Sequence, residues 1–288
     1  MDQLVVLLIA VATSVALLAL VSLGLAIIFG MMRVINFAHG EFIMLGGYAT
    51  VLSANHGVNI WAAIFVVAPA TVAAVGLVAE RLIVRRFYGQ TVMTLLATWG
   101  LSLFLIGAVT ALFGNTTHGV AAPLGSVALG AYSVSAYQLV LIAVVAVLIV
   151  ASLVALNRTS WGLVARGTMQ NPEMASTLGI DPKRVYAVTF TAGAALAGLA
   201  GGLLAPISGV IPHMGASYVA RAFVTVISGG TAMVTGMISA AALFGPIEAL
   251  LSFATTPVIG QAGLLVAAVI LLRLMPEGIS GRFSGRRT

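Results

Sequence analysis

The segment RVINFAHGEFIMLGGY contains four polar side chains, Arg33, Asn36, His39 and Glu41, of which His39 and Glu41 superficially suggest a metal-binding pair. A metal site is not supported, because nothing elsewhere in the sequence supplies the further ligands that a zinc ion needs. These side chains lie beside an apolar stretch, and polar groups at membrane depth usually line a protein interior or a water-filled path. With Gly46 and Gly47, which allow close approach of backbones, the last three of them are candidates for a translocation pathway. The alternative is a cytoplasmic turn between two spans, in which His39 and Glu41 are solvated.

A second candidate for the pathway is the run Ser228-Gly229-Gly230. Glycine pairs and hydroxyl groups inside a span are typical of a discontinuous helix, and broken helices commonly form transport sites. A plain turn between two short spans explains the glycines equally well. Arg221 and Glu248 lie in the same apolar region, where they could form an ion pair.

Enzyme motifs are absent from the sequence. Lys183, the single lysine, follows Ile-Asp-Pro and does not belong to a glycine-rich phosphate loop, so the chain has no Walker A site of its own. There is no HExxH, no GxSxG and no cysteine, which excludes a cysteine nucleophile, disulfides and thiolate metal sites. We therefore expect no catalytic residue, no metal site and no cofactor on this chain.

The composition is that of a membrane protein. Of the 288 residues, 61% are hydrophobic and only 7% are charged, with a mean hydropathy of +1.15. A soluble domain has about 25% charged residues, so this chain could not cover a surface that faces water. The net charge of +6 is not gathered on one patch, and we expect no nucleic-acid partner.

Nine apolar segments, each near the roughly 20 residues that cross a bilayer, are separated by more polar stretches. They run over residues 4–30, 36–54, 60–79, 91–113, 137–156, 185–207, 217–235, 236–255 and 261–275. The second is short, and the pair between 217 and 255 is broken by glycines and polar groups, so some segments could be re-entrant. We expect an all-α polytopic membrane helix bundle of about 8–10 transmembrane helices, forming one domain over residues 1–288.

Basic residues predict the topology. They gather in three regions: residues 81–86, residues 157–184 and the C-terminal end from Arg273 onward. By the positive-inside rule these regions are cytoplasmic. The loop 114–136 has no lysine or arginine, so it is expected on the extracytoplasmic side, where it could lie over a pore mouth.

The cytoplasmic loop 157–184 is predicted to hold one short helix with a signal at each end. Asn171 suits the N-cap, Pro172 the first helical position and Glu173 the positive end of the helix dipole. Gly179 suits the left-handed position that ends a helix, and Asp181-Pro182 repeats the start signal. Because so short a helix is marginal alone, we expect the face formed by Met174 and Leu178 to dock into another protein.

The span after this loop contains small residues at helical spacing. They form two adjacent strips, the first with Gly193, Ala197 and Gly201, the second with Ala194, Gly198 and Gly202. Small residues four apart let two helix backbones pack closely inside a membrane. We interpret Gly193, Ala197, Gly198, Gly201 and Gly202 as helix-packing residues, which would make this span rigid enough to pass movement of the loop into the bundle.

Several of these segments together resemble a known family. EMASTLG, residues 173–179, is similar to the EAA-x-x-x-G signature of ABC-importer permeases, with Met174 in place of an alanine. RVINFAHGEFIMLGGY, LGIDPKRVYAVTFTAGAALAGLAGGL and LMPEGISGR resemble the permease family of branched-chain amino acid importers, of the LivH/LivM type and closer to LivH. The resemblance covers nearly the whole chain.

The resemblance implies a permease subunit with four kinds of partner. These are a homologous permease subunit, identical or paralogous, two cytoplasmic ATPase subunits that bind ATP and magnesium, an extracytoplasmic substrate-binding protein and the lipid bilayer. It also implies that the 171–179 helix is the coupling helix, seated in a groove of an ATPase subunit through Asn171, Pro172, Glu173, Met174, Leu178 and Gly179.

The expected function is ATP-driven import of branched-chain or other apolar amino acids. An alternative is a permease for urea or short amides, because Gly230 is followed by Thr-Ala-Met-Val-Thr and not by the glycine-serine step usual in the family. An alternative of another class is an ion-coupled secondary carrier, for which Glu248 is the best candidate for an acidic relay residue.

Overall fold

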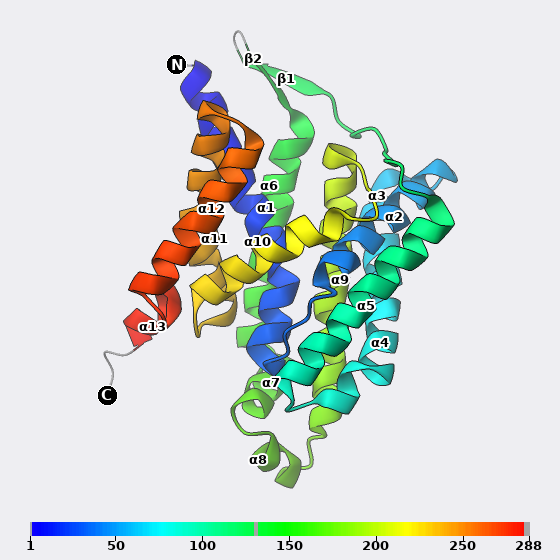
Figure 1. The fold of residues 1–288 in the computed structure, drawn as a ribbon, viewed down its shortest axis with the longest axis vertical. Helices are drawn as coiled ribbons and strands as arrows, with labels where there is room; N and C mark the ends of the chain where they lie inside the picture. Colours follow the sequence, from blue (N-terminus) through cyan, green and yellow to red (C-terminus); the bar gives the residue numbers. More distant parts are fainter. Residues whose placement is uncertain (1, 130–131, 285–288) are drawn as a thin grey trace. The chain divides into compact units, whose positions relative to one another are not determined.

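The computed structural model describes residues 2–129 and 132–284 and is almost entirely helical (Figure 1). The first half contains α1 (Asp2–Met32), α2 (His39–Asn55), α3 (Ile60–Ala62), a π-helical turn (Ala63–Val67), α4 (Ala68–Leu82), a 3-10 turn (Val84–Phe87) and α5 (Thr91–Phe113). The second half contains β1 (Ser126–Leu129), β2 (Tyr132–Ser135), α6 (Ala136–Arg158), α7 (Ser160–Gln170), α8 (Pro172–Thr177), α9 (Pro182–Ser208), α10 (Met214–Gly229), α11 (Met233–Ala254), α12 (Pro257–Leu274) and α13 (Gly278–Ser284). The all-α class predicted from composition is therefore correct.

Seven helical stretches in the described part of the chain are long and apolar enough to cross a membrane. They are Gln3–Met32, Ile60–Leu82, Thr91–Phe113, Ala136–Arg158, Pro182–Ser208, Met233–Ala254 and Pro257–Gly281. The other two predicted segments form the shorter helices α2, of 17 residues, and α10, of 16 residues. These are the regions that the sequence indicated as short or broken.

Two predicted boundaries were wrong. The segments 217–235 and 236–255 were separated at residue 236, whereas α10 ends at Gly229 and α11 begins at Met233. The glycines that end α10 lie in the turn itself, and apolar composition alone does not distinguish a turn of small residues from a span. The last span begins at Pro257 and not at 261, because Thr256 caps it by accepting a hydrogen bond from the Ile259 amide, at 3.4 Å.

The chain divides into two compact units. Unit 1 consists of residues 1–22, 122–150 and 221–288, and unit 2 of residues 23–121 and 151–220. In unit 1, α11 packs against α12 and α13. In unit 2, α9 packs along both α2 and α4 (Figure 1).

The central helix of unit 2 is α9. In its membrane-length stretch 72% of the residues are buried, against 11% in that of α6. Its start is set by Asp181, whose carboxylate accepts a hydrogen bond from the Lys183 amide at 2.9 Å, followed by Pro182 at the first helical position. Among the seven candidate spans, the helix that begins directly after the 157–184 loop is therefore the one most enclosed by protein.

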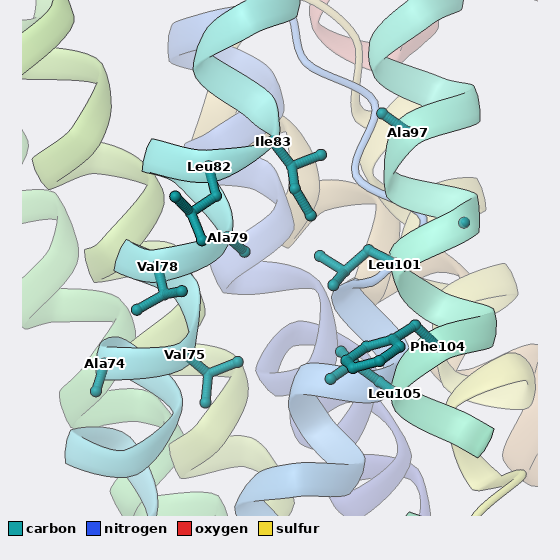
Figure 2. Close-up of a pocket in the computed structure, with 11 residues that line it drawn as sticks. Ala74, Val75, Val78, Ala79, Leu82, Ile83, Ala97, Leu101, Phe104 and Leu105 are labelled. Carbon is teal, nitrogen blue, oxygen red and sulfur yellow. The ribbon is translucent and has the colours of Figure 1, made fainter. Parts of the chain in front are cut away.

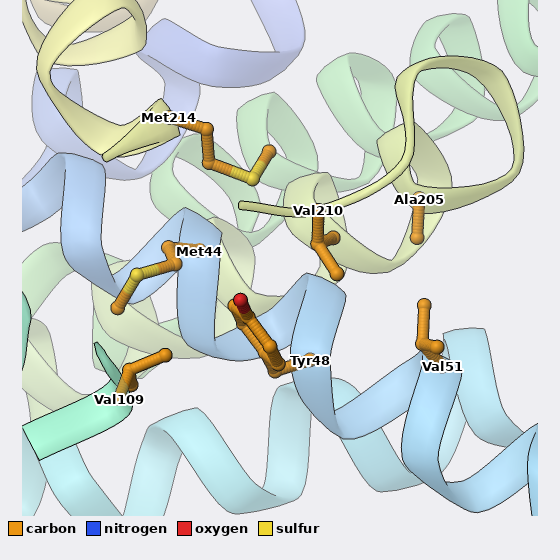
Figure 3. Close-up of a cluster of buried hydrophobic side chains, with 7 residues drawn as sticks. All are labelled: Met44, Tyr48, Val51, Val109, Ala205, Val210 and Met214. Carbon is orange, nitrogen blue, oxygen red and sulfur yellow. The ribbon is translucent and has the colours of Figure 1, made fainter. Parts of the chain in front are cut away.

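A hydrophobic cluster fixes one end of unit 2. Its buried side chains gather around the Tyr48 ring (Figure 3) and are Met44, Tyr48, Val51, Val109, Ala205, Val210 and Met214. Tyr48 stacks on Phe113 with ring centroids 5.1 Å apart. The outer loop joins this cluster, because His118 and Val210 exchange backbone hydrogen bonds of 3.0 and 2.7 Å. The loop following α5 is thereby tied to the segment following α9.

The loop 114–136 also contains secondary structure that the sequence analysis did not predict. Strands β1 and β2 pair antiparallel, with Ser126 opposite Ser135 and Val127 opposite Val134. The run SVAL is too short to give a clear alternation of polar and apolar residues, so it could not be distinguished from an irregular loop.

Candidate functional site

The short helix α8 has the N-terminus that its sequence predicts. The Asn171 side chain accepts a hydrogen bond from the Met174 amide at 2.9 Å, and Pro172 occupies the first helical position. Glu173 lies in the first turn, where its charge interacts favourably with the helix dipole. These contacts start the helix at a fixed residue.

The C-terminus of α8 is a Schellman motif. Gly179 has a φ of +83°, the left-handed conformation that glycine adopts without strain. The amide of Ile180 donates to the carbonyl of Ala175, and that of Gly179 to Ser176, both at 3.0 Å. Both ends of this six-residue helix are therefore determined by local hydrogen bonds.

One face of α8 is apolar and uncovered. The side chains of Met174 and Leu178, four residues apart, are 58% and 74% exposed, whereas Ala175 is buried against the rest of the chain. Within unit 2, α8 contacts α7 and α9. The helix is thus held from behind and presents two large apolar side chains outward.

The expectation of a single helix in the 157–184 loop was wrong, because α7 precedes α8. Thr159 starts α7 by accepting a hydrogen bond from the Gly162 amide at 3.0 Å. A Cβ at Gly162 would overlap the carbonyl oxygens at the end of α6, so only glycine permits this sharp bend. Thr159 followed by a serine and an apolar residue is an N-cap signal that could have predicted α7.

The polar residues of the first candidate pathway are buried in unit 2. Asn36, His39 and Glu41 are each no more than 1% exposed, which contradicts the alternative of a solvated turn. The Asn36 side chain accepts a hydrogen bond from the Ala38 amide at 3.1 Å and shapes the start of α2. No group of three or more His, Asp or Glu side chains among residues 2–129 and 132–284 is arranged to hold a metal ion.

The link between α1 and α2 is anchored on α5. The hydroxyl of Thr98 accepts a hydrogen bond from the Phe37 amide and donates one to the Ile35 carbonyl, each at 3.1 Å. One turn further along α5, Ser102 lies near the Glu41 side chain. A hydroxyl of α5 therefore holds the backbone of the link, whereas Nδ2 of Asn36 and Oε2 of Glu41 are buried without a hydrogen-bond partner among the described residues.

Glycines bring neighbouring backbones into contact with α2. A Cβ at Gly40 would overlap Gly215 at the start of α10, and one at Gly46 would overlap Gly198 of α9. At Gly47 the space for a Cβ is filled by Val210. The structure places Gly46 and Gly47 at helix contacts within unit 2.

The two strips of small residues on α9 face different neighbours. Gly193 lies against α1, where an added Cβ would be 2.5 Å from Cγ1 of Ile28, and Ala197 is buried nearby. At Gly198 an added Cβ would be 2.7 Å from Cβ of Val72 on α4. At Gly201 an added Cβ would overlap the Ile43 carbonyl. An added Cβ would likewise meet Thr50 at Gly202 and Ala194 at Gly76.

In unit 1, Ser228 and Gly229 are the last residues of α10, and Gly230 begins the turn to α11. Gly230 has a φ of +82°, and its backbone packs directly on that of Gly278. The Ser280 hydroxyl donates to the Gly229 carbonyl at 2.6 Å and accepts from the Ala232 amide at 3.0 Å. Of the two interpretations of this segment, a discontinuous helix or a plain turn, the geometry agrees with the plain turn. Residues 277–280 (EGIS) hold this turn in place.

Arg221 and Glu248 form an ion pair within unit 1. Nη1 of Arg221 lies 3.1 Å from Oε1 of Glu248, and the side chains are 16% and 13% exposed. The Ser14 hydroxyl donates to the other carboxylate oxygen at 3.4 Å. This pair joins α10, α11 and the first part of α1.

A buried cluster at the turn between α4 and α5 was missed by the sequence analysis. Glu80 is fully buried and accepts hydrogen bonds of 3.0 and 3.2 Å from Arg85 and a further one from the Tyr88 hydroxyl. Burial and then the contact with Glu80 raise the pKa of the Tyr88 phenol. An acid followed at five residues by an arginine was the available signal, although on a helix this spacing does not by itself predict a contact.

A groove of about 700 Å³ lies between α4 and α5 and is apolar throughout. Figure 2 shows Leu101 and Phe104 projecting from α5 toward α4. None of the candidate pathway residues Asn36, His39 and Glu41 lines this groove.

Comparison with known proteins finds relatives of one family, which align with 92% of this chain. LivH of Salmonella typhimurium, a high-affinity branched-chain amino acid transport system permease protein, is 30% identical over 282 residues, covering 92% of this chain and 91% of the relative. BraD of Pseudomonas aeruginosa, with a corresponding description, is also 30% identical, with coverage of 92% and 91%. A probable LivH of Methanocaldococcus jannaschii is 27% identical, with coverage of 92% and 89%. No solved structure matches the chain.

The family model described as "Branched-chain amino acid transport system / permease component" matches residues 7–275, which include the α2 polar segment, α8, the strips of α9 and the turn at Gly230. Seven helical stretches among the residues that the structure describes are apolar enough to span a membrane, so the chain is a multi-pass inner-membrane protein, and it belongs to the family of permease components of branched-chain amino acid transport systems.

Proposed function

We propose that this permease is the membrane subunit of an ATP-driven ABC importer for branched-chain or other apolar amino acids. It would form half of the translocation pathway beside a homologous permease subunit. Two cytoplasmic ATPase subunits would supply ATP hydrolysis with magnesium, and an extracytoplasmic binding protein would deliver the substrate. The names of the relatives support the amino acid class over urea or short amides.

The observation that carries this proposal is the exposed face of α8. Two large apolar side chains, Met174 and Leu178, point away from the chain on a helix whose ends are both capped. An amphipathic helix with this pattern is suited to a hydrophobic groove on another protein. Because α9 begins directly after α8, displacement of α8 by closure of the ATPase pair would be passed to the most buried helix of unit 2.

Co-purification with the ATPase subunits tests the coupling role. A Met174→Asp, Leu178→Asp variant leaves both caps intact and should lose the ATPase subunits while the permease still elutes as a folded protein. Ser176→Asp is the matched control, since Ser176 is exposed on the opposite side of the same helix, and it should retain them. Equal retention by all three proteins would refute docking through this face.

A Glu173→Arg, Gly179→Pro double variant tests the capped ends. Proline cannot adopt the φ of +83° at position 179, and arginine places a positive charge at the positive end of the dipole. We expect loss of ATPase-dependent uptake of leucine into proteoliposomes that contain ATP, with the membrane fold retained. Uptake driven by an ion gradient without ATP would instead support the secondary carrier.

A further inference from the structure

A second groove in unit 2, of about 590 Å³, runs between α4 and α9. Its walls are small or apolar and come from Ala73 and Leu77 on α4 and from Ala187, Val188, Thr191, Ala192 and Ala195 on α9. Three arginines, Arg81, Arg85 and Arg184, line the same groove. Arg81 lies in the last turn of α4, Arg85 in the 3-10 turn that follows it and Arg184 at the start of α9. The end of α4 and the start of α9 lie at the same end of unit 2 (Figure 1).

The arginines leave uncompensated positive charge at this end. Arg85 is engaged by the buried Glu80. Arg184 has a weak partner, because its Nε is 3.4 Å from Asp181 while both side chains are largely exposed. The guanidinium of Arg81 makes no hydrogen bond or ion pair with any residue of the described chain.

The neighbouring sequence increases this positive charge. Segments 80–86 and 181–184 together contain five basic residues and two acidic ones. By the positive-inside rule both segments lie at the cytoplasmic surface, whose leaflet is rich in anionic lipids.

The groove therefore combines an apolar wall within two membrane-spanning helices and a cationic mouth at the membrane surface. A water-soluble anion would satisfy the arginines but would leave the apolar wall unoccupied. A zwitterionic lipid would fill the wall but carries no net charge for the arginines. By contrast, the groove between α4 and α5 has no charged residue in its lining and no feature that selects an occupant.

We propose that the α4–α9 groove binds an anionic phospholipid of the cytoplasmic leaflet, with one acyl chain along α9 and the phosphate at Arg81 and Arg184. Such a lipid would fill the space between α4 and α9, the helix to which displacement of α8 would be passed. Its headgroup would lie directly beside Asp181, the residue that caps α9.

Native mass spectrometry of the purified full complex tests this proposal, with phosphatidylglycerol and phosphatidylcholine of identical acyl chains as probes. The wild type should retain phosphatidylglycerol in preference to phosphatidylcholine. In the Arg81→Gln, Arg184→Gln variant the retention of phosphatidylglycerol should fall by about tenfold or more. Each arginine near a membrane surface contributes about 1 kcal/mol to the binding of anionic lipid, and the variant removes two of them. The matched control is Arg158→Gln, Arg273→Gln, which removes two basic residues that do not line the groove and should leave retention unchanged.

A second variant tests the apolar wall without changing charge. Ala192→Phe fills the groove from the exposed side of α9 and should also reduce retention of phosphatidylglycerol. Equal retention by wild type and both groove variants would overturn the proposal. Displacement of the lipid by free glycerol 3-phosphate would show a site for the headgroup alone, and cross-linking of Ala192→Cys to a partner subunit would show that protein covers the groove; either result would overturn it too.

Discussion

The guanidinium of Arg221 lies 3.1 Å from the carboxylate of Glu248, so that two consecutive helices, α10 and α11, are joined by an ion pair with little access to solvent. Ser14 supplies a further hydrogen bond to the same carboxylate. A carboxylate engaged in this way is suited to holding helices together, and the pair gives a direct test of whether Glu248 relays protons.

Replacing Glu248 with glutamine should leave ATP-driven uptake in place but lower the stability of the permease. Glutamine keeps the size and a hydrogen-bond acceptor, whereas the ion pair between Arg221 and position 248 is lost, at a cost of about 1–3 kcal/mol for a pair that is mostly buried. Thermal unfolding in detergent measures the cost, and the Arg221→Gln, Glu248→Gln double variant should recover part of it. Complete loss of uptake by a folded Glu248→Gln protein would favour the secondary carrier.

Gly201→Ala should destabilise the permease, because the new methyl group would overlap the Ile43 carbonyl where α9 crosses α2. Overpacking of this kind costs about 1–3 kcal/mol. Gly107→Ala is the matched control, since no atom lies within 4 Å of a Cβ at that position of α5. It should be neutral or stabilising by up to about 1 kcal/mol, and a similar melting temperature for the two variants would contradict the close packing of α2 and α9.

Removing the Ser280 hydroxyl should loosen the turn between α10 and α11. Ser280→Ala deletes the hydrogen bonds to Gly229 and Ala232, and each contributes about 1 kcal/mol. Hydrogen exchange should therefore accelerate in residues 228–234. Ser239→Ala, which removes a hydroxyl bonded only to the carbonyl of Thr235 in its own helix, should leave that exchange unchanged.

Tyr88 should make the stability of the permease fall at alkaline pH. Its folded-state pKa is raised above the ordinary value of about 10, mainly by burial and then by Glu80. A group with a raised pKa contributes stability that is complete below the unfolded pKa and is lost as the pH rises through the folded one. The melting temperature of the wild type should fall more steeply above about pH 10 than that of Tyr88→Phe. Parallel curves would show that Tyr88 is not coupled to folding.

Local signals allowed much of this structure to be predicted. The boundaries of α5 agree with the predicted segment 91–113, and α8 has its predicted cap at Asn171 and its predicted stop at Gly179. These features depend on residues close together in sequence, where capping and hydropathy determine the outcome.

Contacts between segments that are far apart in the sequence could not be predicted from such local signals. Ser280 hydrogen-bonds Gly229, and Thr98 hydrogen-bonds the backbone of Ile35 and Phe37. These contacts depend on the packing of segments that are far apart in the chain. The polarity of His39 and Glu41 indicated an unusual place in the membrane, but not whether it was solvated. Burial is decided by neighbouring helices, and hydropathy along one segment contains no information about them.

The two caps of α8 also fix its rotational phase. Asn171 and Gly179 determine where the helix begins and ends, so one residue inserted between Met174 and Leu178 would turn these two side chains apart by about 100°. If α8 is exchanged between two permeases, the whole segment from Asn171 to Asp181 must therefore be transferred together. Transferring only Met174 and Leu178, without the two caps, would leave the direction in which these side chains point undetermined.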